Sequence, residues 1–87
     1  MVEPRRVTID NESGTSLTYV YYVDEDAFAQ PRKVMPNVRR GRHVVADVDE
    51  HGTLMGIEML DMSAETLQMA RALAAEYGAV LPTFLAT

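Results

Sequence analysis

Apolar and polar residues alternate near the start of the chain with the two-residue period of a β-strand. Over residues 5–10, Val7 and Ile9 alternate with polar neighbours, which predicts a first strand. The Asn-Glu-Ser-Gly segment at 11–14 has the composition of a turn. Residues 15–23 follow as a second strand, because they are rich in the β-branched and aromatic residues that suit a pleated surface.

This second strand carries apolar bulk on both faces. One face is predicted to hold Leu17, Tyr19, Tyr21 and Val23, and the other Thr18, Val20 and Tyr22. A strand that is apolar on both sides is typical of a fully buried position. We therefore expect it at the centre of a sheet or beneath a second subunit.

The next segment is less regular. The acidic run at 24–26 ends the second strand, and Pro31 and Pro36 enclose a short edge strand that we place at 33–35. Prolines suit an edge because they remove donors from the hydrogen-bond ladder. The Arg-Arg-Gly-Arg sequence at 39–42 predicts a turn.

The most regular pattern is a hairpin between His43 and Leu60. An apolar, β-branched strand at 42–48 leads into an acidic, glycine-containing turn at 49–52, and a second apolar strand follows at 53–60. In that second strand Met55, Ile57 and Met59 are predicted to share one face, with Glu58 on the other.

A helix follows at 63–77. Ser63 is a favoured N-cap, and Gly78 provides a usual end. One stripe at helical spacing consists of Leu67, Ala70, Leu73, Ala74 and Tyr77. The tail at 80–85 is apolar, so we expect it to pack on the sheet or on a neighbouring chain.

These elements predict an α+β domain. It comprises a small antiparallel β-meander of about four to five strands over 5–60, one C-terminal α-helix at 63–77 packed on the sheet, and an apolar tail at 78–87. At 87 residues we expect one domain, 1–87.

The size and composition of the chain favour self-association. A chain of this size buries only roughly 60–65% of its unfolded surface, and small domains often add disulfides, metals or a partner chain. The chain has no cysteine, which excludes disulfides and thiolate metal sites. We therefore expect a homodimer, whose interface uses the aromatic strand and the tail: Tyr19, Tyr21, Tyr22, Leu81, Phe84 and Leu85.

Charge and hydropathy narrow the location and the partners. The first six residues, MVEPRR, have no apolar segment behind the arginines, so we expect no secretory signal. No apolar run approaches the roughly 20 residues that span a bilayer. A net charge of −5 disfavours general nucleic-acid binding. A cytoplasmic protein without membrane contact is the resulting expectation.

The hairpin contains two distinctive motifs, Asp47-Val48-Asp49-Glu50-His51-Gly52 and Gly56-Ile57-Glu58-Met59-Leu60, and Ile9-Asp10-Asn11-Glu12 precedes the aromatic strand. With these motifs the chain resembles the small bacterial domain family DUF2283, a domain of unknown function. The resemblance covers roughly residues 7–62. It implies a small β-meander with a helix and no assigned activity, and some members look like partners of small toxin-like proteins.

The acidic hairpin at 47–58 is the best candidate for a metal site. Aligned with the calcium-loop pattern, Asp47, Asp49 and Glu58 fall at ligand positions, but His51 stands where an oxygen donor is needed. The flanking residues also predict strands and not helices. We therefore favour a polar turn, with metal binding by Asp47, Asp49 and Glu58 as a weak alternative.

Other chemistry has little support in the sequence. His43 and His51 are candidate acid–base groups, but no nucleophile motif accompanies them. The acidic run at 24–26 with Asp61 is a candidate carboxylate pair, for which solvated loops are the plainer interpretation. Seven of the eight basic residues lie between Arg5 and Arg42, and we favour surface salt bridges over nucleic-acid binding for them.

The sequence alone therefore favours a non-enzymatic, self-associating protein-interaction module without a cofactor. Its partner is a second copy or another small protein. The alternative is a domain that binds a small molecule or a metal through the acidic hairpin at 47–58.

Overall fold

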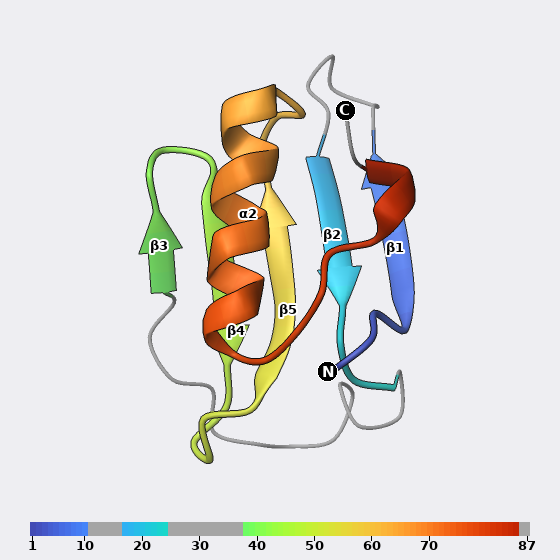
Figure 1. Cartoon of the computed structure of the whole chain (residues 1–87), viewed down its shortest axis with the longest axis vertical. Coiled ribbons are helices and arrows are strands. Elements are labelled where there is room, and N and C mark those ends of the chain that lie inside the picture. The colour runs from blue at the N-terminus through green and yellow to red at the C-terminus, as the bar shows by residue number, and fades with distance from the viewer. Residues whose placement is uncertain (11–16, 25–37, 86–87) are drawn as a thin grey trace.

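In the part of the chain that the structure describes, five antiparallel strands form one sheet, and one α-helix packs on one of its faces (Figure 1). The computed structural model describes residues 1–10, 17–24 and 38–85. The elements are β1 (Arg6–Asp10), β2 (Leu17–Tyr21), β3 (Val38–Arg40), β4 (Val44–Val48), β5 (Leu54–Met59), α2 (Ala64–Glu76) and the short 3₁₀-helix η1 (Thr83–Leu85). The predicted α+β fold with an antiparallel sheet and a C-terminal helix is confirmed.

The strand order is β1-β2-β5-β4-β3. Strands β1 and β2 pair with each other, β3, β4 and β5 follow as a meander, and β2 joins β5 with Thr18 opposite Met59. A meander running through all five strands would place β2 beside β3. Here β5 takes that position, which leaves β1 and β3 as the two edges (Figure 1).

The segment Arg39–Arg42 differs from its sequence prediction. Arg39 and Arg40 belong to strand β3 and pair with Val45 and Val44, so the turn begins only at Gly41. The physical reason lies in Arg40, whose guanidinium contacts the Glu76 carboxylate at the end of α2, 2.6 Å away. A long charged side chain can thus occupy an edge strand and keep its head group at the surface. The edge strand predicted at 33–35 and the turn at 11–14 lie outside the described residues.

The hydrophobic core lies between α2 and the sheet. Helix residues Leu67, Ala70, Leu73 and Ala74 are buried as the stripe predicted, and Tyr77 packs partly against them. The sheet contributes alternate residues from its central strands: Val20, Tyr22, Val44, Ala46, Val48, Ile57 and Met59. The prediction that Thr18, Val20 and Tyr22 share one face is confirmed, since all three are buried on this side.

Local signals set both ends of α2. The Ser63 hydroxyl accepts a hydrogen bond from the backbone N–H of Thr66, which is the usual N-cap contact. After the C-cap at Tyr77, Gly78 has a φ of +69°, a conformation that glycine adopts at little cost. Both caps were predicted from the sequence.

The tail after α2 turns back across the sheet toward β1 (Figure 1). Ala79 bridges to Val2, and the Tyr22 hydroxyl donates a hydrogen bond to the Val80 carbonyl oxygen at 2.8 Å. Leu81 and Leu85 are each only 5% exposed. Leu81 and Leu85 thus pack on their own chain, which is one of the two packings expected from the sequence, whereas Phe84 between them is exposed.

Candidate functional site

The acidic turn at 49–52 is organised by Asp49. One oxygen of this nearly buried side chain accepts hydrogen bonds from the backbone N–H groups of His51 and Thr53, both at 2.9 Å. Asp49 and Thr53 also share a backbone hydrogen bond of 3.0 Å. A carboxylate that satisfies the backbone of its own turn is a structural cap. This oxygen of Asp49 is therefore already used inside the protein.

Asp47 and Glu58 lie apart from that turn. Both occupy the sheet face away from α2, here called the second face, where Asp47 is opposite Gly56 and Glu58 is opposite Val45. A carboxylate oxygen of Asp47 accepts a hydrogen bond from the Tyr19 hydroxyl at 2.6 Å. Within the described residues no three His, Asp or Glu side chains are placed to hold a metal ion. The three candidate ligands of the hairpin are thus not brought together as a set.

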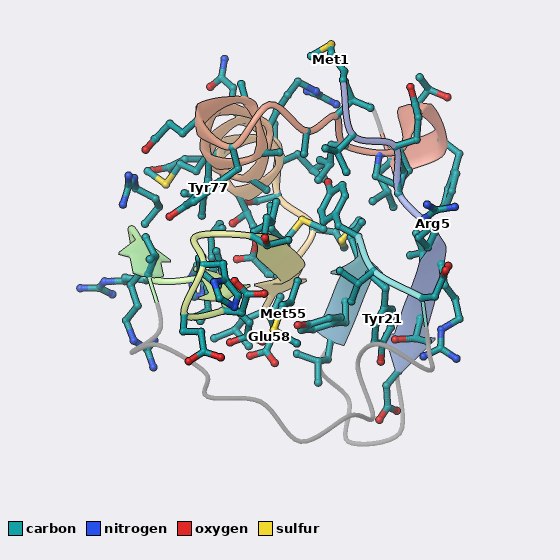
Figure 2. The ribbon with its side chains drawn as sticks, turned by 90° about the horizontal axis from the view of Figure 1, so that it is seen from below. Met1, Arg5, Tyr21, Met55, Glu58 and Tyr77 are labelled. Atoms are coloured by element: carbon teal, nitrogen blue, oxygen red, sulfur yellow. The ribbon has the colours of Figure 1, made fainter. Side chains whose placement is uncertain are left out.

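The second face carries a row of stacked side chains. Tyr19 and Tyr21 lie with ring centroids 4.6 Å apart and planes tilted by 56°, and the Arg6 guanidinium lies 4.2 Å from the Tyr21 ring centroid. Figure 2 shows Tyr21 and Glu58 on the side of the sheet opposite the helix. Burial, followed by the hydrogen bond to Asp47, raises the pKa of the Tyr19 hydroxyl well above its ordinary value. Tyr19 is therefore a neutral donor at physiological pH and no candidate acid–base group.

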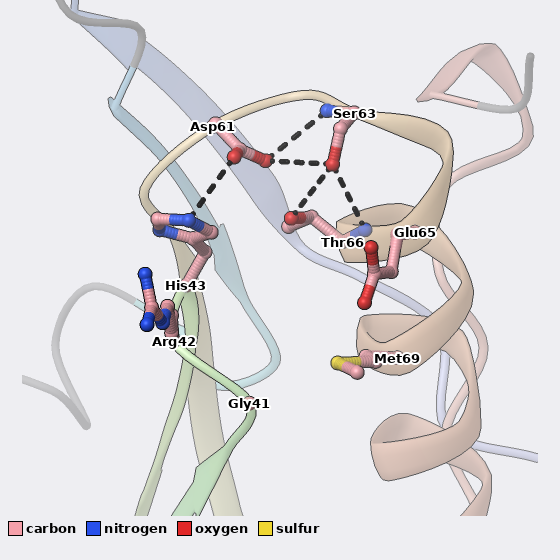
Figure 3. A pocket seen from close by; sticks show the side chains of 8 residues that line it. All are labelled: Gly41, Arg42, His43, Asp61, Ser63, Glu65, Thr66 and Met69. Carbon is pink, nitrogen blue, oxygen red and sulfur yellow. Dashed lines mark hydrogen bonds and ion pairs between the residues drawn. The ribbon is translucent and has the colours of Figure 1, made fainter.

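A cleft with several polar side chains lies between the β3–β4 turn and the start of α2 (Figure 3). It has a volume of about 310 Å³. Its lining residues are Gly41, Arg42, His43, Asp61, Ser63, Glu65, Thr66 and Met69. His43 and Asp61, which are 18 positions apart in the sequence, meet here with 3.4 Å between Nε2 of the imidazole and a carboxylate oxygen. Sequence reasoning considered each residue but did not predict that they meet.

The order of contacts in this cleft decides its chemistry. Asp61 lies between His43 and Ser63: one of its oxygens faces the imidazole, and the other accepts from the Ser63 backbone N–H at 3.1 Å, with the Ser63 hydroxyl also 3.1 Å away. A serine nucleophile needs the histidine itself on its hydroxyl. Ser63 is instead bound to the carboxylate and to the N–H of Thr66. The cluster therefore stabilises the start of a helix and does not activate a nucleophile.

The electrostatics of Asp61 agree with this role. The Thr66 hydroxyl and then the Ser63 backbone N–H lower the pKa of the Asp61 carboxyl, and His43 adds to the effect. A carboxylate at this position also complements the positive end of the helix dipole. Asp61 is thus held ionised as part of the cap.

The remaining charged candidates lie at the surface. The His51 side chain is 78% exposed and lies 3.8 Å from Glu50. Arg5 contacts Asp24 at 3.7 Å, and Arg40 contacts Glu76. These pairs fit the surface-charge interpretation of the basic residues, and exposed pairs of this kind contribute about 0–1 kcal/mol each.

The predicted interface residues divide into two groups. Tyr22, Leu81 and Leu85 are 4–5% exposed and pack in the chain's own core, so they offer almost no surface to a partner. In the described structure these three side chains are covered by residues of their own chain. Tyr19 and Tyr21 are half-buried on the second face, and Phe84 is 69% exposed on η1.

Sequence reasoning missed the exposed apolar residue of β1. Ile9 is 53% exposed in a strand that forms one edge of the sheet. The alternation of Val7 and Ile9 correctly predicted a strand, but alternation does not say whether a strand is central or lies at an edge.

Comparisons with family models, with curated proteins and with solved structures found no match to this chain. None of the described helices has the length and apolar character required to cross a membrane.

Proposed function

We propose that this chain is a non-enzymatic protein-interaction module that self-associates as a homodimer through the β1 edge of its sheet. The observation that carries the proposal is where the exposed apolar side chains lie. Of the five large apolar residues exposed in the described structure, Ile9 lies in β1 itself, and Phe84 lies in η1 and lines a groove beside the start of β1. Apolar groups gathered on one side of a protein mark an interaction surface more often than single exposed residues do.

A groove follows this edge. It has a volume of about 290 Å³ and is lined by Pro4, Arg5, Arg6, Val7, Pro82 and Phe84, so that η1 and the start of β1 form its two walls. Ile9 is two residues beyond Val7 in the same strand and on the same face. An edge strand also presents backbone donors and acceptors to another strand. The edge therefore combines apolar contact with the capacity for β-pairing.

The small size of the chain supports self-association as the use of this edge. A domain of 87 residues has a limited core. A second copy of the same chain would cover Ile9 and Phe84. The alternative of a metal or small-molecule site in the hairpin receives no such support. In Asp47 and in Asp49, a carboxylate oxygen already accepts a hydrogen bond from within the protein.

Light scattering across a concentration series tests the proposal. The wild-type protein is expected to rise toward twice the monomer mass of 9.7 kDa. Ile9→Lys and Phe84→Ser should shift the protein toward the monomer, whereas Leu60→Ser is the matched control because Leu60 is also exposed but lies after β5. Thermal melts establish that each variant is folded. A wild-type protein that stays at 9.7 kDa up to millimolar concentration would overturn the proposal.

A further inference from the structure

Strand β1 is complementary to itself when two copies run antiparallel. Its sequence is Arg6-Val7-Thr8-Ile9-Asp10. With Thr8 opposite Thr8 of a second copy, Arg6 faces Asp10, Val7 faces Ile9, and each pair occurs twice. Opposite charges, apolar β-branched pairs and Thr–Thr pairs are all favourable when directly opposite in antiparallel strands.

The faces of the strand agree with this pairing. Val7 is opposite Val20 of β2, so Val7 and Ile9 point to the α2 side, whereas Arg6, Thr8 and Asp10 point to the second face. A two-fold axis perpendicular to the sheet preserves these faces in both copies. The Val7–Ile9 pairs would then extend the apolar layer beneath the helices, and the Arg6–Asp10 pairs would lie on the opposite face.

Neighbouring registers lose this match. If the axis passed through Val7, Ile9 would face Arg5 and Asp10 would face Pro4. If it passed through Ile9, Thr8 would face Asp10, and Arg6 would lie beyond the last residue of the partner strand. The axis at Thr8 alone pairs both charges and both apolar residues within the strand.

The edge itself is accessible in the described structure. β1 is the terminal strand of the sheet, and Arg6, Thr8, Ile9 and Asp10 are all exposed (Figure 1). The Arg6 guanidinium, 4.2 Å from the Tyr21 ring centroid, is already held on the second face, where Asp10 of a second copy would arrive.

We infer that the occupant of the β1 edge is a second copy of this chain, paired antiparallel about a two-fold axis at Thr8, so that the two sheets form one continuous ten-stranded sheet. This inference rests on the proposed function and specifies its geometry. Both α2 helices would lie on the same face of the joined sheet.

Cysteine crosslinking tests the register, because the chain contains no cysteine of its own. Directly opposite residues have Cβ atoms about 4.5–5.5 Å apart, close to the spacing of a disulfide. Under mild oxidation Thr8→Cys is expected to form a covalent dimer. Arg6→Cys and Asp10→Cys should each give no covalent dimer alone, because like positions lie four residues apart along the paired strands. The two variants should crosslink when they are mixed.

Charge reversal gives a second test that needs no disulfide. Arg6→Asp and Asp10→Arg should each raise the Kd of the dimer about tenfold, since two pairs change in each dimer. The double variant restores opposite charges across the axis and should return the Kd toward that of the wild type. Melting curves of each variant show whether a loss of association reflects unfolding.

The outcomes separate this inference from the proposed function. A dimer by light scattering with no Thr8→Cys crosslink and no recovery in the double variant would overturn the register and leave self-association standing. A protein that is monomeric at every concentration would overturn both. A crosslink at Thr8, together with recovery in the charge-reversed pair, would support both.

Discussion

The Tyr19 hydroxyl on β2 donates a hydrogen bond of 2.6 Å to Asp47 on β4, across the intervening strand β5. Tyr19 is opposite Glu58, and Asp47 is opposite Gly56, so the tyrosine side chain lies diagonally over the middle strand. A Cβ atom at Gly56 would overlap the Tyr19 ring. The glycine of the Gly-Ile-Glu-Met-Leu segment is therefore required by the close approach of an aromatic ring from the neighbouring strand.

Gly56→Ala is expected to destabilise the protein. The new methyl group must either displace the Tyr19 ring, which breaks its hydrogen bond to Asp47, or shift the backbone of β5. Overpacking of this kind costs about 1–3 kcal/mol of the free energy of unfolding. Urea denaturation followed by circular dichroism measures that free energy.

A Tyr19→Ala background supplies the control for this substitution. Without the ring, the methyl group at position 56 has space, so Gly56→Ala should cost much less there than in the wild-type background. The difference between the two costs is the coupling energy of the pair. Equal costs in the two backgrounds would contradict the steric explanation and point to the backbone of β5 alone.

Asp49 is expected to matter through its oxygen and not through its charge. Asp49→Ala removes the acceptor for the N–H groups of His51 and Thr53 and should lower the free energy of unfolding by about 1–3 kcal/mol. Asp49→Asn keeps an acceptor oxygen, so it should be much less destabilising. Chemical denaturation of the two variants distinguishes these roles. A large loss in Asp49→Asn would show that the charge itself is needed.

Metal addition should leave the melting temperature unchanged. An ion that binds only the folded protein must raise the melting temperature. The candidate ligands Asp47 and Asp49 use oxygens for hydrogen bonds within the protein, and Glu58 is on a different rung of the sheet. Melts with and without calcium, magnesium and zinc measure the effect. A rise that disappears in Asp47→Asn would restore the hairpin as a metal site.

The elements that sequence predicted well are those whose signals are local. Ser63 and Gly78 lie at the two ends of α2, and the helical stripe between them needs no knowledge of the rest of the chain. The hairpin of β4 and β5 is equally local, because its strands join through the five residues 49–53. In these cases the residues that determine the element lie within the element or next to it in the sequence.

Long-range pairing could not be predicted in the same way. The alternation in β2 fits either β3 or β5 as its neighbour, and only the assembled sheet places β5 there. The burial of Tyr22 depends on the tail, whose Val80 carbonyl accepts its hydrogen bond from 58 positions away. The sequence of β2 correctly predicted that both of its faces are apolar. It could not predict which segment covers Tyr22.

The candidate site shows the same limit. His43 and Asp61 meet because the β4–β5 ladder continues to a hydrogen bond between the Leu60 N–H and the His43 carbonyl oxygen. That contact depends on the register of the hairpin, which the sequence indicated only approximately. The Arg39–Arg40 segment was placed in a turn because arginines beside a glycine resemble one, whereas pairing of Val38 with Ala46 extends the strand.

Asp61 should stabilise the folded protein at neutral pH and lose this effect at acidic pH. Its pKa is lowered in the folded protein, mainly by the Thr66 hydroxyl, so its contribution is present at neutral pH and is lost as the pH falls below the ordinary value of 3.8 through the folded pKa. Asp61→Asn should therefore be less stable than the wild type at neutral pH, with a difference that shrinks in acid. Denaturation curves at several pH values measure it. Thr66→Val keeps the carboxylate but removes the hydroxyl, so it should reduce the pH dependence, and an unchanged dependence would contradict the assigned cause.

Tyr22 should contribute an alkaline dependence of the opposite sign. Burial raises the pKa of its hydroxyl from 10.0 to about 12, so the stability that it provides is complete below pH 10 and is lost as the pH rises toward 12. Tyr22→Phe loses the hydrogen bond to the Val80 carbonyl, about 1 kcal/mol at neutral pH, but has no hydroxyl to ionise. Its stability should fall less steeply than that of the wild type between pH 10 and 12, and Tyr19 affects both proteins alike. Urea denaturation measures the free energy of unfolding of both proteins over this range. An equally steep fall in the two would contradict the assignment of this pH dependence to the Tyr22 hydroxyl.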